Sequence, residues 1–399
     1  MLFPPSATSD ARRLVAARAL RGFADGLVSV LLASHLAAMG LSAAQVGAVV
    51  TATLLGSAAL TLAVGLGGQR LPERSVLLAA SLLMFATGLA FAGVSAFPLL
   101  LLVAFVGTLN PSGGDVSVFL PTEQSLLAAN VDAADRTSLL ARYNVAGTLL
   151  AALGALATGA PVLVAPEDAA QPRTFLLYGA VAIGIGALYL GLRSGRSVRA
   201  TDAGRGRLVE ARSAVLRLTA LFSLDSFGGG FVVDSLLALW LFRRFDLSLE
   251  TVGAVFFGAR LLSAFSQLVS ARLAARIGLV RTMVYTHLPS NLFLIAAAFM
   301  PTASSAIGML LARMALSQMD VPARQSYVIA VTPPAERAAA VSVTNVPRSL
   351  ASALPPIAAG ALLEASDFGW PLVIGGALKI TYDLLLLAQF RRVVPKEEC

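Results

Sequence analysis

The chain has 399 residues, of which 57% are hydrophobic and only 13% are charged. An ordinary soluble protein carries about 25% charged residues, so this composition excludes a typical soluble enzyme and indicates an integral membrane protein. The net charge of +8 comes mainly from arginines in short segments between apolar runs, which is typical of membrane orientation signals and not of a nucleic-acid-binding surface. The single cysteine, Cys399, excludes a disulfide framework and a thiolate metal site.

Apolar runs of about 20 residues, long enough to cross a bilayer as helices, recur along the whole chain. The segment from Met1 to Asp10 lacks the basic region and cleavage site of a signal peptide, so we expect the first run to remain as a membrane anchor. We predict an all-α membrane protein with twelve transmembrane helices, at residues 13–38, 44–68, 75–94, 97–127, 137–161, 174–192, 213–242, 249–271, 279–300, 304–329, 338–363 and 370–390.

Arginines concentrate in alternate loops, in the N-terminal tail and in the C-terminal tail. Loops rich in Arg and Lys stay in the cytoplasm, so both chain ends are predicted to be cytoplasmic. The dominance of Ala, Leu and Arg favours a GC-rich bacterial genome, and we expect a multi-pass protein of the bacterial cytoplasmic (inner) membrane.

The two halves of the sequence repeat each other at a spacing of about 200 residues, and internal repeats decide architecture. An even number of spans in each half, with both ends inside, predicts parallel halves related by an axis along the membrane normal. We therefore expect two pseudo-symmetric six-helix bundles, at residues 1–192 and 213–399, joined by a cytoplasmic linker at 193–212. The matching residues are Pro121, Gln124, Ser125, Arg136, Asn144 and Gly159, which recur as Pro322, Gln325, Ser326, Arg337, Asn345 and Gly360.

The fourth predicted span is interrupted at residues 110–124 by Asn110, Pro111, two glycines and Asp115. Backbone that leaves a helix at membrane depth must be buried in protein or line a watery cavity. A charge there costs roughly 2.5–3.5 kcal/mol on insertion scales, and interrupted helices often mark a transporter's binding site. We predict a binding site here; the alternative is a packing kink in which Asp115 bonds to a neighbour.

The loop at residues 65–74 resembles the G-x-x-x-D-R-x-G-x-R motif of the major facilitator superfamily, with Arg70 and Arg74 at its basic positions and Gln69 in place of the acid. A second copy at residues 271–281 has Arg276 after Ala275. On these motifs and the repeat, the chain is identified as a member of this superfamily over its whole length. The arginine that many drug/proton antiporters of the family carry in the fourth span is missing near Leu109.

The resemblance implies that the first, fourth, seventh and tenth spans line a central cavity. These four spans carry many of the ionisable residues of the chain, and such residues inside a membrane usually serve transport. An alternative is that Asp25 or Asp225 pairs with an arginine such as Arg21 or Arg313 and binds nothing. The candidate proton- and substrate-binding residues are Asp25, Asn110, Asp115, Asp225, Asp234 and Arg313.

Glu123 and Arg324 occupy equivalent positions in the repeat and carry opposite charges. A salt bridge between them would close the inner gate; alternatively, each caps its own helix or meets a loop arginine. In the last span, Lys379 and Asp383 are four residues apart and are predicted to neutralise each other. The remaining gating candidates, by the motif or the repeat, are Arg70, Arg74, Arg136, Arg276 and Arg337.

The sequence contains no phosphate loop, serine-hydrolase elbow or zinc-protease motif. We therefore predict no enzyme, no cofactor and no resident metal, but a monomeric secondary active transporter in the lipid bilayer, working by alternating access on a small-molecule substrate, with no nucleic acid as partner. The favoured function is proton-coupled efflux of small cationic or amphiphilic organic molecules. The alternatives are transport of a divalent metal held by Asp25, Asp115 and Asp225, proton-coupled uptake of a small metabolite, or a membrane-embedded sensor or enzyme.

Overall fold

The computed structural model describes residues 3–67, 71–112, 117–132, 135–163, 167–193, 211–333 and 336–390. Over these ranges the chain forms helices and connecting turns, without a strand. The predicted all-helical fold is therefore confirmed. Arg70 and Asp115 lie outside the described residues, and their predicted roles stay predictions.

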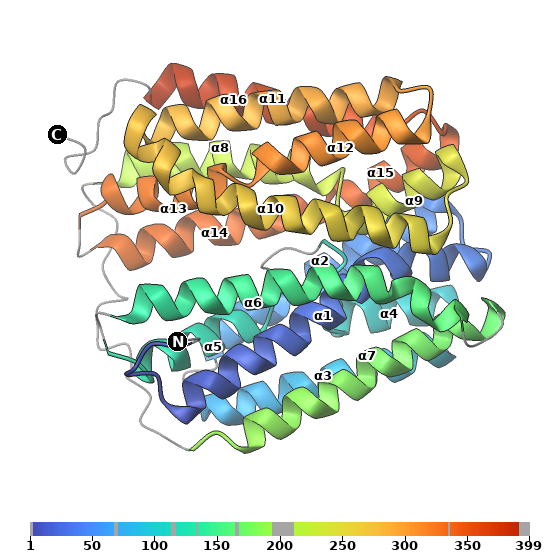
Figure 1. The fold of residues 1–399 in the computed structure, drawn as a ribbon, viewed down its shortest axis with the longest axis horizontal. Helices are drawn as coiled ribbons and strands as arrows, with labels where there is room; N and C mark the ends of the chain where they lie inside the picture. Colours follow the sequence, from blue (N-terminus) through green and yellow to red (C-terminus); the bar gives the residue numbers. More distant parts are fainter. Residues whose placement is uncertain are drawn as a thin grey trace. The chain divides into compact units, whose positions relative to one another are not determined.

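The chain forms two compact units (Figure 1). Unit 1 comprises Met1–Arg199 and Val233–Phe257. Its helices are α1 (Ser9–Ala38), α2 (Ala43–Gly67), α3 (Glu73–Gly93), α4 (Phe97–Val106), α5 (Phe119–Ala129), α6 (Arg136–Leu156), the 3-10 helix η3 (Ala157–Leu163), α7 (Glu167–Leu190), α9 (Asp234–Phe245) and the start of α10 (Leu249–Ile277).

Unit 2 comprises Ala200–Val232 and Gly258–Cys399. It contains α8 (Arg212–Gly230), the rest of α10, α11 (Leu279–Phe299), α12 (Ala303–Ser317), α13 (Asp320–Ala330), α14 (Arg337–Ala353), α15 (Pro355–Ala365) and α16 (Trp370–Phe390). The segment Val233–Phe257, which the sequence places in the second half, packs with unit 1. The predicted linker at 193–212 and the two domain ranges stay predictions.

Every predicted span coincides with one helix or a pair of helices. Eight segments of the described chain are long and apolar enough to cross a membrane. The predicted number of twelve crossings stays a prediction, because several spans are divided into shorter helices. The fourth span divides where the break was predicted, since α4 ends at Val106 and α5 begins at Phe119.

Three spans predicted as continuous are also divided, into α8 and α9, α12 and α13, and α14 and α15. Proline explains several of these starts. Pro121 and Pro322 are each the third residue of their helix, α5 and α13, and Pro355 is the first residue of α15. A proline in the first turn costs no hydrogen bond, because the first amides of a helix have no intrahelical partner, but it prevents the helix from extending backwards unbroken.

The internal repeat is visible in the packing of each unit. In unit 1, α1 packs on α6 and α7, and α3 packs on α7; in unit 2, α8 packs on α14 and α16, and α11 packs on α16 (Figure 1). Small residues permit the closest of these contacts. A Cβ on Gly26 of α1 would overlap the backbone of Ala151 in α6.

Large apolar side chains cover the outside of both units, where a bilayer would solvate them. Leu82 of α3 and Phe265 of α10 are each 68% exposed. The interior of unit 2 is apolar around a core that includes Leu218, Phe222 and Tyr382. Charged groups buried inside such a frame are costly, so the positions where they occur locate the functional site.

Candidate functional site

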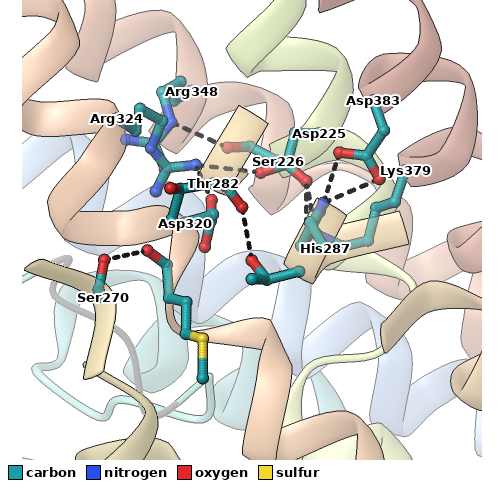
Figure 2. A network of polar contacts seen from close by, with 12 residues as sticks. Asp225, Ser226, Ser270, Thr282, His287, Asp320, Arg324, Arg348, Lys379 and Asp383 are labelled. Atoms are coloured by element: carbon teal, nitrogen blue, oxygen red, sulfur yellow. Dashed lines mark hydrogen bonds and ion pairs between the residues drawn. The ribbon is translucent and has the colours of Figure 1, made fainter. Parts of the chain in front are cut away.

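A buried network of charges lies in unit 2 around Asp225, in the C-terminal half of α8 (Figure 2). Lys379 of α16 donates from Nζ to Asp225 Oδ1 at 2.7 Å. Arg324 of α13 donates from Nη1 to Asp225 Oδ2 at 3.2 Å, and the same nitrogen lies 3.3 Å from Asp320 Oδ2. All four side chains are buried. Each carboxylate oxygen of Asp225 therefore accepts a hydrogen bond from a cationic side chain.

His287 of α11 lies between two carboxylates of this network (Figure 2). Its Nδ1 is 2.9 Å from Asp383 Oδ1, and its Nε2 is 3.7 Å from Asp225 Oδ1. Asn291 fixes the other oxygen of Asp383 with a hydrogen bond of 3.1 Å. Because a carboxylate accepts, the geometry assigns a proton to Nδ1, and a second proton on Nε2 would make the ring a cation between two acids.

A small cavity of about 120 Å³ adjoins Asp225 in the same unit. Its wall is almost entirely polar and combines three cationic side chains with two carboxylates and His287. The lining residues are Asp225, His287, Arg313, Ser317, Gln318, Asp320, Val321, Arg324 and Lys379. A solute that enters this cavity meets the groups that hold Asp225.

Unit 1 has its own buried ion pair, formed by Arg21 of α1 and Glu123 of α5 at 2.6 Å. Tyr143 and Tyr189 both donate their hydroxyls to Glu123, the latter at 2.5 Å. The guanidinium of Arg21 lies 4.7 Å from the centre of the Phe119 ring. Glu123 is completely buried, and its carboxylate accepts hydrogen bonds from Arg21, Tyr143 and Tyr189.

The two ion pairs are related by the repeat, with their charges exchanged. In unit 1 the first helix provides the cation, Arg21, and the helix after the break provides the acid, Glu123. In unit 2 the first helix provides the acid, Asp225, and the helix after the break provides the cation, Arg324. The same framework therefore holds a fully packed pair in one unit and, in the other, a pair beside a cavity.

Comparisons with known proteins agree with this architecture. The sequence profile of the Major Facilitator Superfamily matches residues 14–317 and 226–398. The chain belongs to the major facilitator superfamily. It is therefore an integral, multi-pass membrane transporter rather than an enzyme, as the sequence predicted.

Relatives of this superfamily member share its full length. The uncharacterized membrane protein YJR124C of Saccharomyces cerevisiae is 25% identical over 432 aligned positions, covering 98% of this chain and 96% of the yeast protein. Similar solved structures include the nucleoside transporter NupG (TM-score 0.74, 14% identity, 96% of this chain and 100% of that one). The structure of a D-xylose–proton symporter is also similar (TM-score 0.76, 14% identity, covering 97% of this chain and 99% of that one). These structural likenesses show the fold.

Two of the predicted binding residues in unit 1 lie together. Asp25 of α1 is buried, and Asn110 donates from Nδ2 to its Oδ2 at 3.5 Å. Ser112 in turn donates to Asn110 Oδ1 at 3.0 Å. Asp115 of the same predicted site lies outside the described residues. Asp25 and Asn110 remain a proposed site in the interior of unit 1.

Asp225 and Arg313 of the prediction come together at the cavity of unit 2. Asp234 does not join them, because it lies in the first turn of α9, which packs with unit 1. There Ser235 fixes the start of α9 by donating from Oγ to the carbonyls of Ser29 and Pro111, at 2.9 and 3.1 Å.

The predicted gating residues occupy varied positions. Glu123 and Arg324 are engaged by partners within their own units, and a bridge between them stays a prediction. Three of the arginines donate hydrogen bonds to main-chain carbonyl oxygens near helix ends. The acceptors are Leu190 for Arg74 (2.7 Å), Ala128 for Arg136 (3.1 Å) and Thr332 for Arg337 (3.4 Å). Arg276 is exposed in the last turn of α10.

Sequence reasoning did not place four ionisable members of the network in unit 2 among the candidate site residues: His287, Asp320, Lys379 and Asp383. The spacing of Lys379 and Asp383 predicted a self-neutralising pair, whereas the structure directs Lys379 to Asp225 and Asp383 to His287. A usable signal was present, because two ionisable residues in an otherwise apolar final span are a functional-site hypothesis by default.

Proposed function

We propose that this superfamily member is a proton-coupled secondary transporter of a small polar metabolite, working by alternating access. The observation that supports it is Asp225, a buried carboxylate that shares its oxygens between Lys379 and Arg324 beside a polar cavity. A proton on Asp225 would weaken both contacts at once. Proton uptake is thereby linked to the positions of α8, α13 and α16, which is the coupling that a symporter or antiporter needs.

Proton-coupled efflux of a cationic or amphiphilic molecule is a second candidate, and the site of Asp25 favours it. There a buried carboxylate contacts the neutral amide of Asn110, in a setting that suits a cation or a proton. The cavity of unit 2 suits a cation less well, because Arg313, Arg324 and Lys379 all border it. For this reason we place the uptake or exchange of a polar metabolite first.

The divalent-metal alternative finds no supporting geometry in the described part of the chain. Among those residues, no group of three or more His, Cys, Asp or Glu side chains is arranged to hold a metal ion.

The test uses the full chain reconstituted in liposomes that contain a pH-sensitive dye. Gradients of sugars, nucleosides, short organic acids and quaternary ammonium ions are imposed one at a time. We expect at least one class of solute to drive proton movement, and Asp225→Asn to abolish that movement while solute binding persists. Asp367→Asn, which removes an exposed carboxylate before α16, is the matched control. A solute transport rate that is changed neither by the pH gradient nor by Asp225→Asn would contradict proton coupling.

A further inference from the structure

The cavity beside Asp225 has the electrostatics of an anion site. We propose that it binds the carboxylate of a small organic anion, and that this anion and Asp225 compete for Lys379 and Arg324. Protonation of Asp225 releases the two cations, so the anion and the proton bind together. This inference rests on the proposed function and names the class of its substrate.

The first argument is charge. The cationic groups that surround Asp225 are Lys379 of α16, Arg324 of α13, Arg313 of α12 and Arg348 of α14. The acidic and neutral titratable groups that face it are Asp320, Asp383, His287 and Tyr382. Asp383 and His287 are already paired with each other. With Asp225 ionised, the four cations face three carboxylates, and with Asp225 protonated the positive surplus rises further. Arg324 and Lys379 are buried, and Arg313 and Arg348 are half-buried, so this positive surplus is costly until an anion neutralises it.

The second argument is geometry. Arg324 uses one nitrogen for both Asp225 and Asp320, at 3.2 and 3.3 Å. If the hydrogen bond between Arg324 and Asp225 breaks, Asp320 still orients the Arg324 guanidinium. The other N–H groups of the guanidinium suit a carboxylate ligand. Lys379 lines the cavity, and its Nζ, which is bonded to Asp225, has three donor hydrogens. The acceptor can therefore change from Asp225 to a ligand with little movement of either cation.

The third argument is size. The cavity measures about 120 Å³, and one liquid water occupies about 30 Å³. A carboxylate with a short carbon chain matches this space. A large amphiphilic ion does not, and would have to leave most of its bulk outside.

His287 provides a route for the proton. Its Nδ1–H stays bonded to Asp383, while Nε2 faces Asp225 Oδ1 at 3.7 Å. A proton that leaves the imidazolium Nε2 and joins Asp225 converts the ring to neutral imidazole and the carboxylate to the acid. Asp383 keeps its hydrogen bond to the ring, and the protonated carboxyl of Asp225 then releases Lys379 and Arg324.

The experiment measures binding to the purified full chain by ligand-induced thermal stabilisation and calorimetry at pH 5.5, 6.5 and 7.5. The probes are lactate and pyruvate, the neutral isostere lactamide, and inorganic phosphate. We expect the carboxylates to bind about tenfold more tightly for each unit of falling pH, because one proton is taken up with each anion. Lactamide should bind weakly, with no dependence on pH. Tight binding of phosphate with weak binding of carboxylates would overturn the assignment to an organic acid.

Variants sharpen the test. Asp225→Asn should bind carboxylate at pH 7.5 at least as tightly as wild type does at pH 5.5, with a flat pH profile. Lys379→Gln should lose at least tenfold in affinity at every pH, whereas Arg281→Gln, which removes an exposed cation from α11, should behave as wild type. If the Asp225 or Lys379 variants do not fold, the wild-type comparison of lactate with lactamide still decides the matter.

The two proposals fail separately. Equal binding of lactate and lactamide, or carboxylate binding that weakens at low pH, overturns the anion site even if another solute moves protons in liposomes. Carboxylate binding with the expected pH dependence, but no proton movement with any solute, overturns the proposed coupled transport and leaves the anion site in place.

Discussion

Individual buried charges in this protein are held by partners from distant parts of the chain. Glu123 receives Arg21 and two tyrosine hydroxyls, with no exposed surface. Such an arrangement is not a strong source of net stability, because both charges were first removed from water. Loss of only one partner is nevertheless severe, since the other charge then remains buried and uncompensated.

The substitution Glu123→Gln tests this at the residue scale. It leaves the shape of the site but strands the Arg21 guanidinium, so we expect a loss of about 3–5 kcal/mol in the free energy of unfolding. The measurement is the unfolding midpoint of the purified protein in detergent. Asp132→Asn, which removes an exposed carboxylate between α5 and α6, is the control. Equal midpoints for the two variants would show that Arg21 finds another partner.

At the scale of helices, unit 1 depends on the close approach of α1 and α6. Gly22 and Gly26 of α1 face the backbone of Gly147 and Ala151 in α6, and Gly154 of α6 faces that of Phe23. Because lipid is as apolar as the side chains, packing at close range is the main force that holds such helices together. A methyl group at this contact must push the helices apart.

Gly26→Ala tests the contact. The added Cβ would lie 2.8 Å from the Ala151 Cα, and overpacking of this kind costs roughly 1–3 kcal/mol. We expect a lower melting temperature and less monodisperse protein on gel filtration. The control is Gly308→Ala in α12, where no atom lies within 4 Å of the added Cβ. A fall of the same size in Gly308→Ala would mean that the effect is not one of packing.

At the scale of the whole molecule, the chain consists of two units with the same helix-packing pattern, as expected for a duplicated superfamily member. The membrane orientation is a separate property that the arginine pattern predicts: both chain ends in the cytoplasm. The protein provides its own probe for this, because Cys399 is the only cysteine and lies in the C-terminal tail.

We expect a membrane-impermeant maleimide to leave Cys399 unmodified in intact cells and to label it in inverted membrane vesicles. Cys399→Ser, which should show no labelling in either preparation, is the control. Labelling in intact cells at the rate seen with permeabilised cells would reverse the predicted orientation.

The sequence alone was sufficient for the membrane class, the superfamily, the repeat and the approximate helix positions, but not for the division of three predicted spans into two helices each. These features follow from local information: apolar runs of bilayer length, breakers such as Pro121 and Pro322, and matching residues in two halves. The candidate site was only partly predictable. Asp225 and Arg313 were identified from their spans, but His287 was not among the predicted site residues, and Lys379 and Asp383 were predicted only to neutralise each other.

The partners of the buried charges were decided by the tertiary structure. Lys379 has an acid four residues away in its own helix, and yet it bonds to Asp225, which is 154 residues distant. Such a choice depends on how α8, α11, α13 and α16 converge, because a buried charge takes the partner that best satisfies it in three dimensions. Local sequence specifies which charged residues need a partner inside the membrane, whereas the packing of the helices determines which residue that partner is.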